Sequence, residues 1–528
     1  MLEMIERLCR DRGDAKKEET AVNERREWVH RGLSLDVSRH FMPPEDIRRL
    51  LRAAAQCGVN RLHWHLADDQ GWRVEIKRYP RLAKIGGRRS SPTEKPASSK
   101  NADGFYTQAE IRALVAFAGE LGIDVIPEIE IPGHASAMLA AYPEYGCRRT
   151  VFRDGREQIL SRGYDYRVMG TSGIFPNLIC AGRDESIRFL TDILDEVMAL
   201  FPFPAVHIGG DEALKQHWRR CPDCQARMRA EGLRDEEALQ RWLMLKIGAH
   251  LSARGRSVIV YNDALTGGEL PKHFIVQHWQ GNDAETAAFT ASGGRVICSD
   301  IEHFYFDYPY SAIDVKKLYE MPPIPGYCRG SEDCLLGFEC MLWTEHVPDV
   351  ARAARLLFPR LPAAMLRVTG DPACRTWDEY TDRLRQLREG ADLLGDMWAP
   401  ECHWDMACAN AAGPAADDPQ ADREEALLQR QEALEKLLQE AGMPFPVALS
   451  AMDHAARDIA VYAGTPGSET LPGVPELVKR LHARLAAREN DPRGARALLD
   501  DLKRFASRAR EYHRVHGVWG IDFGLPDA

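Results

Sequence analysis

The chain has 528 residues, of which 45% are hydrophobic and 28% are charged, and its formal net charge is −10. This length predicts two or three domains, and the composition is that of an ordinary globular protein. The negative charge without a basic stripe argues against nucleic-acid binding, and the lack of an apolar stretch of about 20 residues argues against a membrane-spanning helix.

The first part of the chain, residues 1–30, is rich in Arg, Lys and Glu and lacks the apolar core of a signal peptide. We therefore expect a short N-terminal extension and a cytoplasmic location. In that compartment the 13 cysteines are expected to be free thiols. The one local pattern is Cys221-Pro-Asp-Cys224, for which only His217 and Cys180 are convenient additional ligands. Because a zinc site needs four ligands, the sequence favours a packed loop there, with no metal and no cofactor.

Residues 31–399 alternate short apolar strands with amphipathic helices, which is typical of an α/β fold. Eight strands are expected, at Gly32–Val37, Arg61–Leu66, Asp124–Ile131, Ala205–Gly209, Ser257–Asn262, Phe274–Trp279, Arg295–Ser299 and Leu336–Trp343. Helices are expected at Pro44–Gln56, Thr107–Leu121, Ile187–Leu200, Glu236–Ala253, Ala284–Ala291, Val347–Phe358 and Trp377–Leu394. Thr107 and Glu110 have the spacing of a capping box. This rhythm predicts a (β/α)8 TIM barrel, with residues 88–103 and 140–181 as long insertions.

The pattern changes after the barrel. Residues 400–422 are rich in Ala, Pro and Asp and predict a linker, whereas residues 423–528 show only helical patterns. We expect a small all-helical C-terminal domain there. Its heptad-like leucines favour an intramolecular core, and a homodimer is the alternative.

Unusual polar and aromatic residues recur where the expected strands end, which is where such barrels carry their chemistry. They include Asp36, Arg39, His63, His65, Asp68, Asp69, Glu128, Glu130, His134, Asp211, Glu212, Tyr261, Trp279, Tyr305, Asp307, Trp343 and Glu345. Asp211 and Glu212 are adjacent carboxyl groups after a glycine-terminated strand. Such a pair could simply begin a helix, or its pKa values could be driven apart to supply an acid and a charged partner. Carboxylates, Arg and aromatic rings together suit a sugar, whose hydroxyls take charge-assisted hydrogen bonds.

Four motifs resemble β-N-acetylhexosaminidases of glycoside hydrolase family 20. They are Arg31-Gly-Leu-Ser-Leu-Asp-Val-Ser-Arg-His40, His63-Trp-His-Leu-Ala-Asp-Asp-Gln-Gly-Trp72, Pro127-Glu-Ile-Glu-Ile-Pro-Gly-His134 and His207-Ile-Gly-Gly-Asp-Glu212. The resemblance implies an exo-acting, retaining enzyme that removes terminal β-linked GlcNAc or GalNAc from an oligosaccharide or glycoconjugate. The acetamido group of the substrate itself would act as the nucleophile, through an oxazolinium intermediate.

The same resemblance implies roles for individual residues. Glu212 would be the general acid/base, and Asp211 would orient the acetamido group. Tyr305 would donate a hydrogen bond to the acetamido oxygen, while His134 and Asp68 would tune the acid. The substrate-binding residues would be Arg31, Asp307 and Glu345 for ring hydroxyls and Trp279, Trp343 and Tyr261 for the acetamido group.

Two positions depart from the family pattern. Val260-Tyr261-Asn262-Asp263 replaces the usual Gly-Trp-Asp-Glu stretch, and Glu130 stands where many members carry Asp. Two other functions stay open on the residues. One is a metal-dependent barrel hydrolase, in which His63, His65, His134, His207 and Asp211 would form the ligand set. The other is a sugar-binding barrel without catalytic activity.

Overall fold

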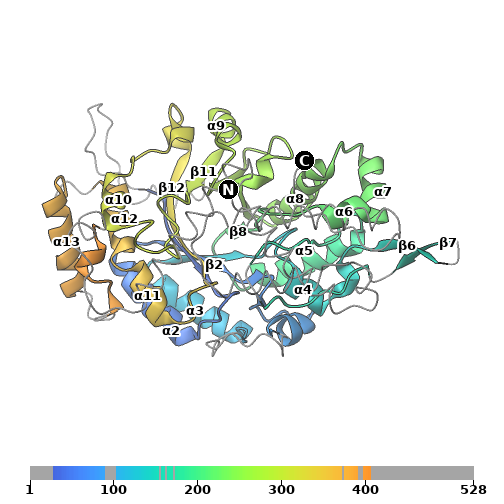
Figure 1. Cartoon of the computed structure of the whole chain (residues 1–528), viewed down its shortest axis with the longest axis horizontal. Helices are drawn as coiled ribbons and strands as arrows, with labels where there is room; N and C mark the ends of the chain where they lie inside the picture. The colour runs from blue at the N-terminus through green and yellow to red at the C-terminus, as the bar shows by residue number, and fades with distance from the viewer. Residues whose placement is uncertain are drawn as a thin grey trace, which may run out of the picture. The chain divides into compact units, whose positions relative to one another are not determined.

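The structure, a computed structural model, describes residues 28–89, 103–153, 156–160, 163–170, 173–370, 374–390 and 397–405. Within these residues, eight parallel strands close a barrel (Figure 1). In their order around the barrel they are β1 (His30–Asp36), β2 (Arg61–His65), β5 (Asp124–Glu128), β8 (Ala205–His207), β9 (Ser257–Tyr261), β10 (Phe274–His278), β11 (Arg295–Cys298) and β12 (Leu335–Leu342). The predicted (β/α)8 barrel and its eight strands are confirmed.

The barrel interior is built in layers, because alternate residues of each strand point inward. One layer is apolar and consists of Ile126, Ala205, Ile259, Ile275 and Ile297. The next inward positions along the strands are polar and buried: His63, Glu128, His207, Gln277 and Glu339. Charged groups in a closed interior must find partners there. An ionic layer therefore lies inside the barrel, next to the carboxyl ends of the strands.

The helices between the strands agree closely with the sequence pattern. The predicted helices are α2 (Pro44–Gln56), α3 (Gln108–Glu120), α5 (Asp184–Met198), α8 (Glu236–Ser252), α9 (Asp283–Ala291), α11 (Val350–Leu357) and α13 (Trp377–Gly390). The capping box of Thr107 and Glu110 is present at the start of α3. The sequence did not predict the helices α4 (Ser136–Ala141), α6 (Gln216–Arg220), α7 (Pro222–Glu231), α10 (Val315–Glu320) and α12 (Arg360–Thr369), which lie in loops or directly after another helix.

The insertion between β5 and α5 has structure of its own. It carries α4 and an antiparallel hairpin of β6 (Arg149–Arg153) and β7 (Arg156–Leu160), which projects outward in Figure 1. A second small antiparallel pair, β3 (Ala67–Asp68) and β4 (Gly71–Trp72), follows β2. Most of the other predicted insertion, residues 90–102, lies outside the described residues.

The barrel domain begins before and ends after the boundaries of its strands. The Trp28 indole is buried and donates to the Val368 carbonyl at 2.6 Å. Trp404 is also buried, and its carbonyl accepts from the Lys316 backbone N–H at 2.9 Å. Residues 1–27 and 406–528, with the predicted C-terminal helical domain, lie outside the described residues. Among the described helices, none combines the length and the apolar character needed to span a bilayer.

A single buried arginine fastens the loop between β11 and β12. The guanidinium of Arg360 donates to the carbonyls of Phe306, Tyr308, Ile313 and Leu356, and its side chain is fully buried. Phe306 and Tyr308 flank Asp307, one of the predicted sugar-binding residues. Arg360 therefore holds the loop that carries Asp307 in place.

We predict that Arg360→Met destabilises the protein by about 3 kcal/mol or more, because each buried carbonyl left without a donor costs about 1–3 kcal/mol. Thermal or urea unfolding of the full chain measures the change. Arg388→Met, on the exposed face of α13, is the matched control and should change stability by less than about 0.5 kcal/mol. Equal effects of the two substitutions would contradict the role given to Arg360.

Candidate active site

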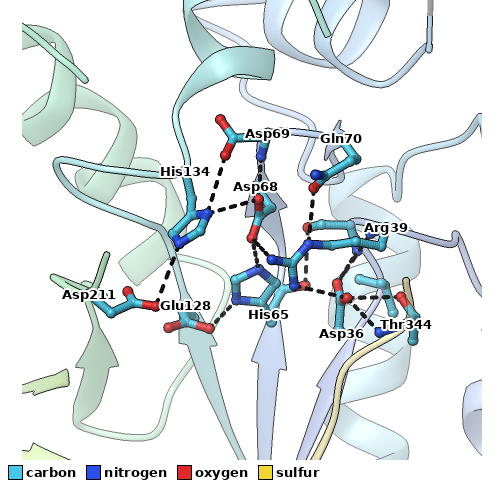
Figure 2. Close-up of polar contacts among 12 residues, drawn as sticks. Asp36, Arg39, His65, Asp68, Asp69, Gln70, Glu128, His134, Asp211 and Thr344 are labelled. Carbon is cyan, nitrogen blue, oxygen red and sulfur yellow. Dashed lines mark hydrogen bonds and ion pairs between the residues drawn. The ribbon is translucent and has the colours of Figure 1, made fainter. Parts of the chain in front are cut away.

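Charged side chains from four strands meet at the carboxyl end of the barrel (Figure 2). Asp36 ends β1 and Arg39 follows it, His65 ends β2 and Asp68 follows it in β3, and Asp211 follows β8. His134 lies in the loop after β5. Figure 2 shows His134 between Asp211 on one side and Asp68 and Asp69 on the other. The expectation that polar residues at the strand ends converge is confirmed by this arrangement.

His134 connects the carboxyl groups that follow β2 with those that follow β8. Its Nδ1 lies 3.2 Å from Asp68 and 3.3 Å from Asp69, and its Nε2 lies 3.6 Å from Asp211 and 3.7 Å from Glu212. Burial by itself disfavours the imidazolium, but the Asp68 and Asp211 carboxylates outweigh it and raise the pKa of His134 well above its usual range. His134 is therefore a fixed cation that faces both carboxyl groups of the adjacent pair.

Backbone geometry aims the pair of carboxyl groups. His134 and Glu212 both have φ of 46°, a left-handed conformation that is uncommon outside glycine and concentrates at functional sites. Two residues before Asp211, Gly209 has φ of 63°, and a Cβ there would lie 1.6 Å from the Glu130 carboxylate. Only glycine fits at that position. The loop after β8 can therefore turn sharply and present Asp211 and Glu212 side by side.

Glu212 has the environment of a proton donor. Burial is the main cause that raises the pKa of Glu212 to about 8. The His134 cation opposes this rise, and the charges of Asp211 and Asp263 add to it. Its side chain is nevertheless 24% exposed, so a substrate can reach it. The Glu212 backbone N–H donates to Asp263 at 3.4 Å. A carboxyl group that is protonated near neutral pH and accessible can act as a general acid.

Three aromatic rings stand beside the pair. Trp279 stacks on Tyr305 with 6.1 Å between ring centroids, and Tyr305 lies 6.3 Å from Trp343. The Trp279 indole donates to Asp263 at 2.8 Å, which ties this ring to the residue that accepts from the Glu212 backbone. Tyr305 is 5% exposed. The three predicted aromatic residues are thus brought together as one wall.

The prediction that Arg31 lies at the site is wrong in position. Arg31 is the second residue of β1, and its side chain donates to the carbonyls of Trp28 and Gly58 at the opposite end of the barrel. The arginine at the site is Arg39, which comes after the same strand. Its guanidinium contacts Asp68 at 2.8 Å and Glu345 at 3.7 Å, and it lies over the Trp343 ring at 5.1 Å. The sequence contained this signal, because only residues after a strand can reach its carboxyl end.

Asp307 and Glu345 lie on the same side of the site as Arg39. Burial and then the neighbouring charge of Glu345 raise the pKa of Asp307 to about 8. The Glu345 side chain is 26% exposed. These two carboxyl groups and Arg39 together offer hydrogen-bond partners of both polarities.

The remaining predicted residue, Tyr261, ends β9 inside the barrel. It is 1% exposed and its ring lies 4.4 Å from the His207 ring. Its contact with a substrate stays a prediction. The neighbouring Asp263, to which the sequence analysis gave no role, is the residue of that stretch that contacts both Trp279 and Glu212.

Beneath the site, Glu128 is the centre of an ionic cluster. It contacts His65, and it lies 3.1 Å from His63 and 2.8 Å from His207. His63 also pairs with Glu339 at 2.7 Å, and His65 pairs with Asp68 at 2.9 Å. Each imidazole nitrogen of His63 and His65 therefore faces a carboxylate. The His-x-His pattern, which suggested a metal-dependent hydrolase, is accounted for by these pairs.

Comparisons with known proteins agree with this geometry. The model of the glycosyl hydrolase family 20 catalytic domain matches residues 28–367. A β-hexosaminidase of Porphyromonas gingivalis is 34% identical over 386 residues, which are 71% of this chain and 47% of that protein. The chain thus spans about half the length of that relative.

Two solved structures extend the comparison. A β-N-acetylhexosaminidase from Bacteroides fragilis has a TM-score of 0.62 at 28% identity, with 74% of each chain covered. A family 20 exo-β-N-acetylglucosaminidase from Vibrio harveyi, in complex with N-acetylglucosamine, has a TM-score of 0.60 at 28% identity, covering 72% of this chain and 60% of that one.

We predict that the ionic cluster makes the fold sensitive to alkali. Burial disfavours both imidazolium ions, but the charge of Glu128 raises the pKa of His63 to about 10 and that of His65 to about 9. The folded state therefore holds protons that the unfolded state releases above its pKa of about 6.5. This stability is fully present below about pH 6.5 and is lost as the pH rises towards 9–10.

Thermal unfolding midpoints measured from pH 6 to pH 10 test this expectation. Glu128→Gln should lower the thermal midpoint at pH 7 and reduce the free energy of unfolding by about 3–5 kcal/mol, because it leaves buried imidazolium ions without a partner. It should also flatten the alkaline decline. Glu320→Gln, whose side chain is 62% exposed on α10, is the control. Parallel pH curves for Glu128→Gln and wild type would contradict the assignment.

Proposed function

The chain belongs to glycosyl hydrolase family 20, and we propose that it is an exo-acting, retaining β-N-acetylhexosaminidase that uses the acetamido group of its substrate as the nucleophile. The observation that carries this proposal is the adjacent pair Asp211 and Glu212, both of which face the same nitrogen of the His134 imidazolium. Glu212 is an accessible carboxyl group whose pKa is raised to about 8, and Asp211 stands beside it. Two different roles at adjacent positions are what a substrate-assisted reaction requires.

In the first step, the protonated Glu212 carboxyl group donates its proton to the glycosidic oxygen. The acetamido carbonyl oxygen of the substrate forms a bond to the anomeric carbon as the bond to the leaving sugar breaks. Asp211 accepts a hydrogen bond from the acetamido N–H and stabilises the positive charge of the oxazolinium intermediate. The Tyr305 hydroxyl donates to the acetamido oxygen, and the Trp279 and Trp343 rings enclose the acetamido methyl group.

In the second step, the Glu212 carboxylate takes a proton from water. The water oxygen forms a bond to the anomeric carbon, and the bond to the acetamido oxygen breaks. Two inversions at this carbon retain the β-configuration. Glu212 is protonated again at the end of the cycle, ready for the next substrate.

The sugar hydroxyls are bound by Arg39, Asp307 and Glu345. Arg39 can donate from its planar fork, and Asp307 and Glu345 can accept. The related Vibrio harveyi structure contains N-acetylglucosamine, which supports a terminal GlcNAc as one substrate. A terminal GalNAc differs by one hydroxyl epimer at C4, so it is the second substrate to test.

We predict that Glu212→Gln lowers kcat/KM by about 10²–10⁴-fold on a β-linked GlcNAc disaccharide, because general acid catalysis contributes about that factor. The loss should be smaller on 4-nitrophenyl β-N-acetylglucosaminide, whose leaving group needs less protonation. Asp211→Asn should lower the rate on both substrates. In the wild type, kcat/KM should fall above about pH 8 as Glu212 loses its proton, and this limb should be absent in Glu212→Gln.

The matched control is Glu320→Gln, which should keep wild-type kinetics. The wild type should also fail to turn over 4-nitrophenyl β-glucoside, because that sugar has no acetamido nucleophile. Equal turnover of the glucoside would rule out substrate assistance. GlcNAc binding without turnover of either substrate would instead support a sugar-binding barrel.

We predict that two arginines of one motif behave differently. Arg39→Lys keeps the charge but loses the planar fork, so kcat/KM should fall by about 10–100-fold, the value of one or two charge-assisted hydrogen bonds. Arg31→Lys, at the far end of β1, should leave kcat and KM unchanged. Steady-state kinetics on the same substrate compare them, and a kinetic loss in Arg31→Lys alone would overturn the placement of the sugar beside Arg39.

A further inference from the structure

Four buried cysteines from distant parts of the chain meet outside the active site. Cys147 and Cys180 come from the insertion between α4 and α5, and Cys221 and Cys224 stand at the start of α7. Their exposed fractions are 1% or less. The Sγ atoms of Cys180 lie 3.7 Å from Cys224 and 3.8 Å from Cys221, and Cys147 lies 4.0 Å from Cys224. All four sulfur atoms lie within 4.8 Å of one another.

These distances distinguish between the possible states of the thiols. A disulfide would bring two sulfur atoms to about 2.05 Å, so the four cysteines are not paired in this way. In a regular tetrahedron with Zn–S bonds of about 2.3 Å, each S···S edge is about 3.8 Å long. The three measured separations bracket that edge. We propose that Cys147, Cys180, Cys221 and Cys224 bind one structural Zn²⁺ ion through four thiolates.

The surroundings of the cluster suit a closed metal site. Cys221-x-x-Cys224 is a ligand pair with the spacing found in zinc sites, and it lies at the N-terminus of a ten-residue helix, which favours thiolates. The Arg148 guanidinium forms a two-point ion pair with Asp223, which lies between the two cysteines of this pair in the chain. This ion pair fixes the segment that follows Cys147 against the start of α7.

The backbones around the cluster are already held close together. A Cβ at Gly182 would lie 2.2 Å from the Asp223 backbone, so the two segments touch there. The Trp218 indole donates to the Ile179 carbonyl at 2.9 Å. His217, the fourth ligand considered from the sequence, instead stacks on the Tyr164 ring at 3.5 Å. Cys147 takes that place, and its position 33 residues before Cys180 hid it from any spacing motif.

The zinc site would connect two segments of the chain, one after Glu212 of the catalytic pair and one after His134. Cys221 follows Glu212 by nine residues in the chain. On the other side, the insertion begins just after His134, and its Ile179 backbone N–H donates to Pro132 at 3.1 Å. Four cysteine ligands leave no open coordination position, so the metal has a structural role and does not activate water.

The first test is the metal content of the full chain, purified under reducing conditions without added metal and measured by inductively coupled plasma mass spectrometry. We expect about one zinc per chain, released when a mercurial reagent titrates the thiols and detected with a chromophoric chelator. Replacement by Co²⁺ should produce the visible bands and the sulfur-to-cobalt charge transfer of a tetrahedral tetrathiolate. This spectrum identifies the ligands independently of activity.

Variants then assign the ligands. Cys180→Ser and Cys224→Ser should lose the metal and lower the thermal midpoint, whereas Cys328→Ser, at a buried cysteine outside the cluster, should keep one zinc. Cys224→His, which can still ligate, should retain metal with a shifted Co²⁺ spectrum, and it remains informative if the serine variants do not fold. Zinc-free wild type that fails to take up Zn²⁺ at micromolar concentration with its thiols reduced would overturn the proposal. So would iron in place of zinc, or a native mass four hydrogens lower from two disulfides.

Discussion

The site depends on charge pairing inside the barrel. A carboxylate in a closed interior is stable only when cations meet it, because its desolvation costs several kcal/mol. Glu128 meets the imidazolium ions of His63 and His65, Asp68 meets His65, Arg39 and His134, and His134 in turn meets Asp211. Negative and positive groups therefore alternate from the barrel centre to the catalytic pair. A shift of any one member would leave a neighbour buried without its counter-charge, so the whole chain of contacts holds Asp211 and Glu212 in place.

Two adjacent carboxyl groups stand at the end of this chain of contacts, and their surroundings differ. The Nε2 atom of His134 is almost equidistant from them, at 3.6 Å and 3.7 Å. The distance to the cation therefore does not separate their roles. What separates them is the surroundings of Glu212, where burial and the nearby Asp211 and Asp263 carboxylates favour the protonated form. Asp263 also fixes Trp279, so one residue connects the acid to the aromatic wall.

Sequence reasoning succeeded where the signal is local. Short apolar runs bounded by turns located the eight strands, and the strand-end rule located most of the site. It failed where the answer depends on which residues meet across strands. Arg31 and Arg39 belong to one motif, but Arg31 is near the start of β1 and Arg39 comes after its end, so they lie at opposite ends of the barrel. The role of Glu128 depends on its register with His65 and His207 on the two neighbouring strands. Neither pairing leaves a trace in the spacing of residues along the chain.

The loops explain why a barrel alone is insufficient for this chemistry. Strands bring residues to one end, but His134, Glu212, Tyr305 and Asp307 all lie beyond the ends of strands. A side chain there stays within a fraction of an ångström of its working position only if its segment is tied to something rigid. Arg360 provides that tie for the Tyr305 loop through the carbonyls of Phe306, Tyr308 and Ile313. The zinc site proposed at the four cysteines would do so for the insertion that follows His134 and the segment that follows Glu212.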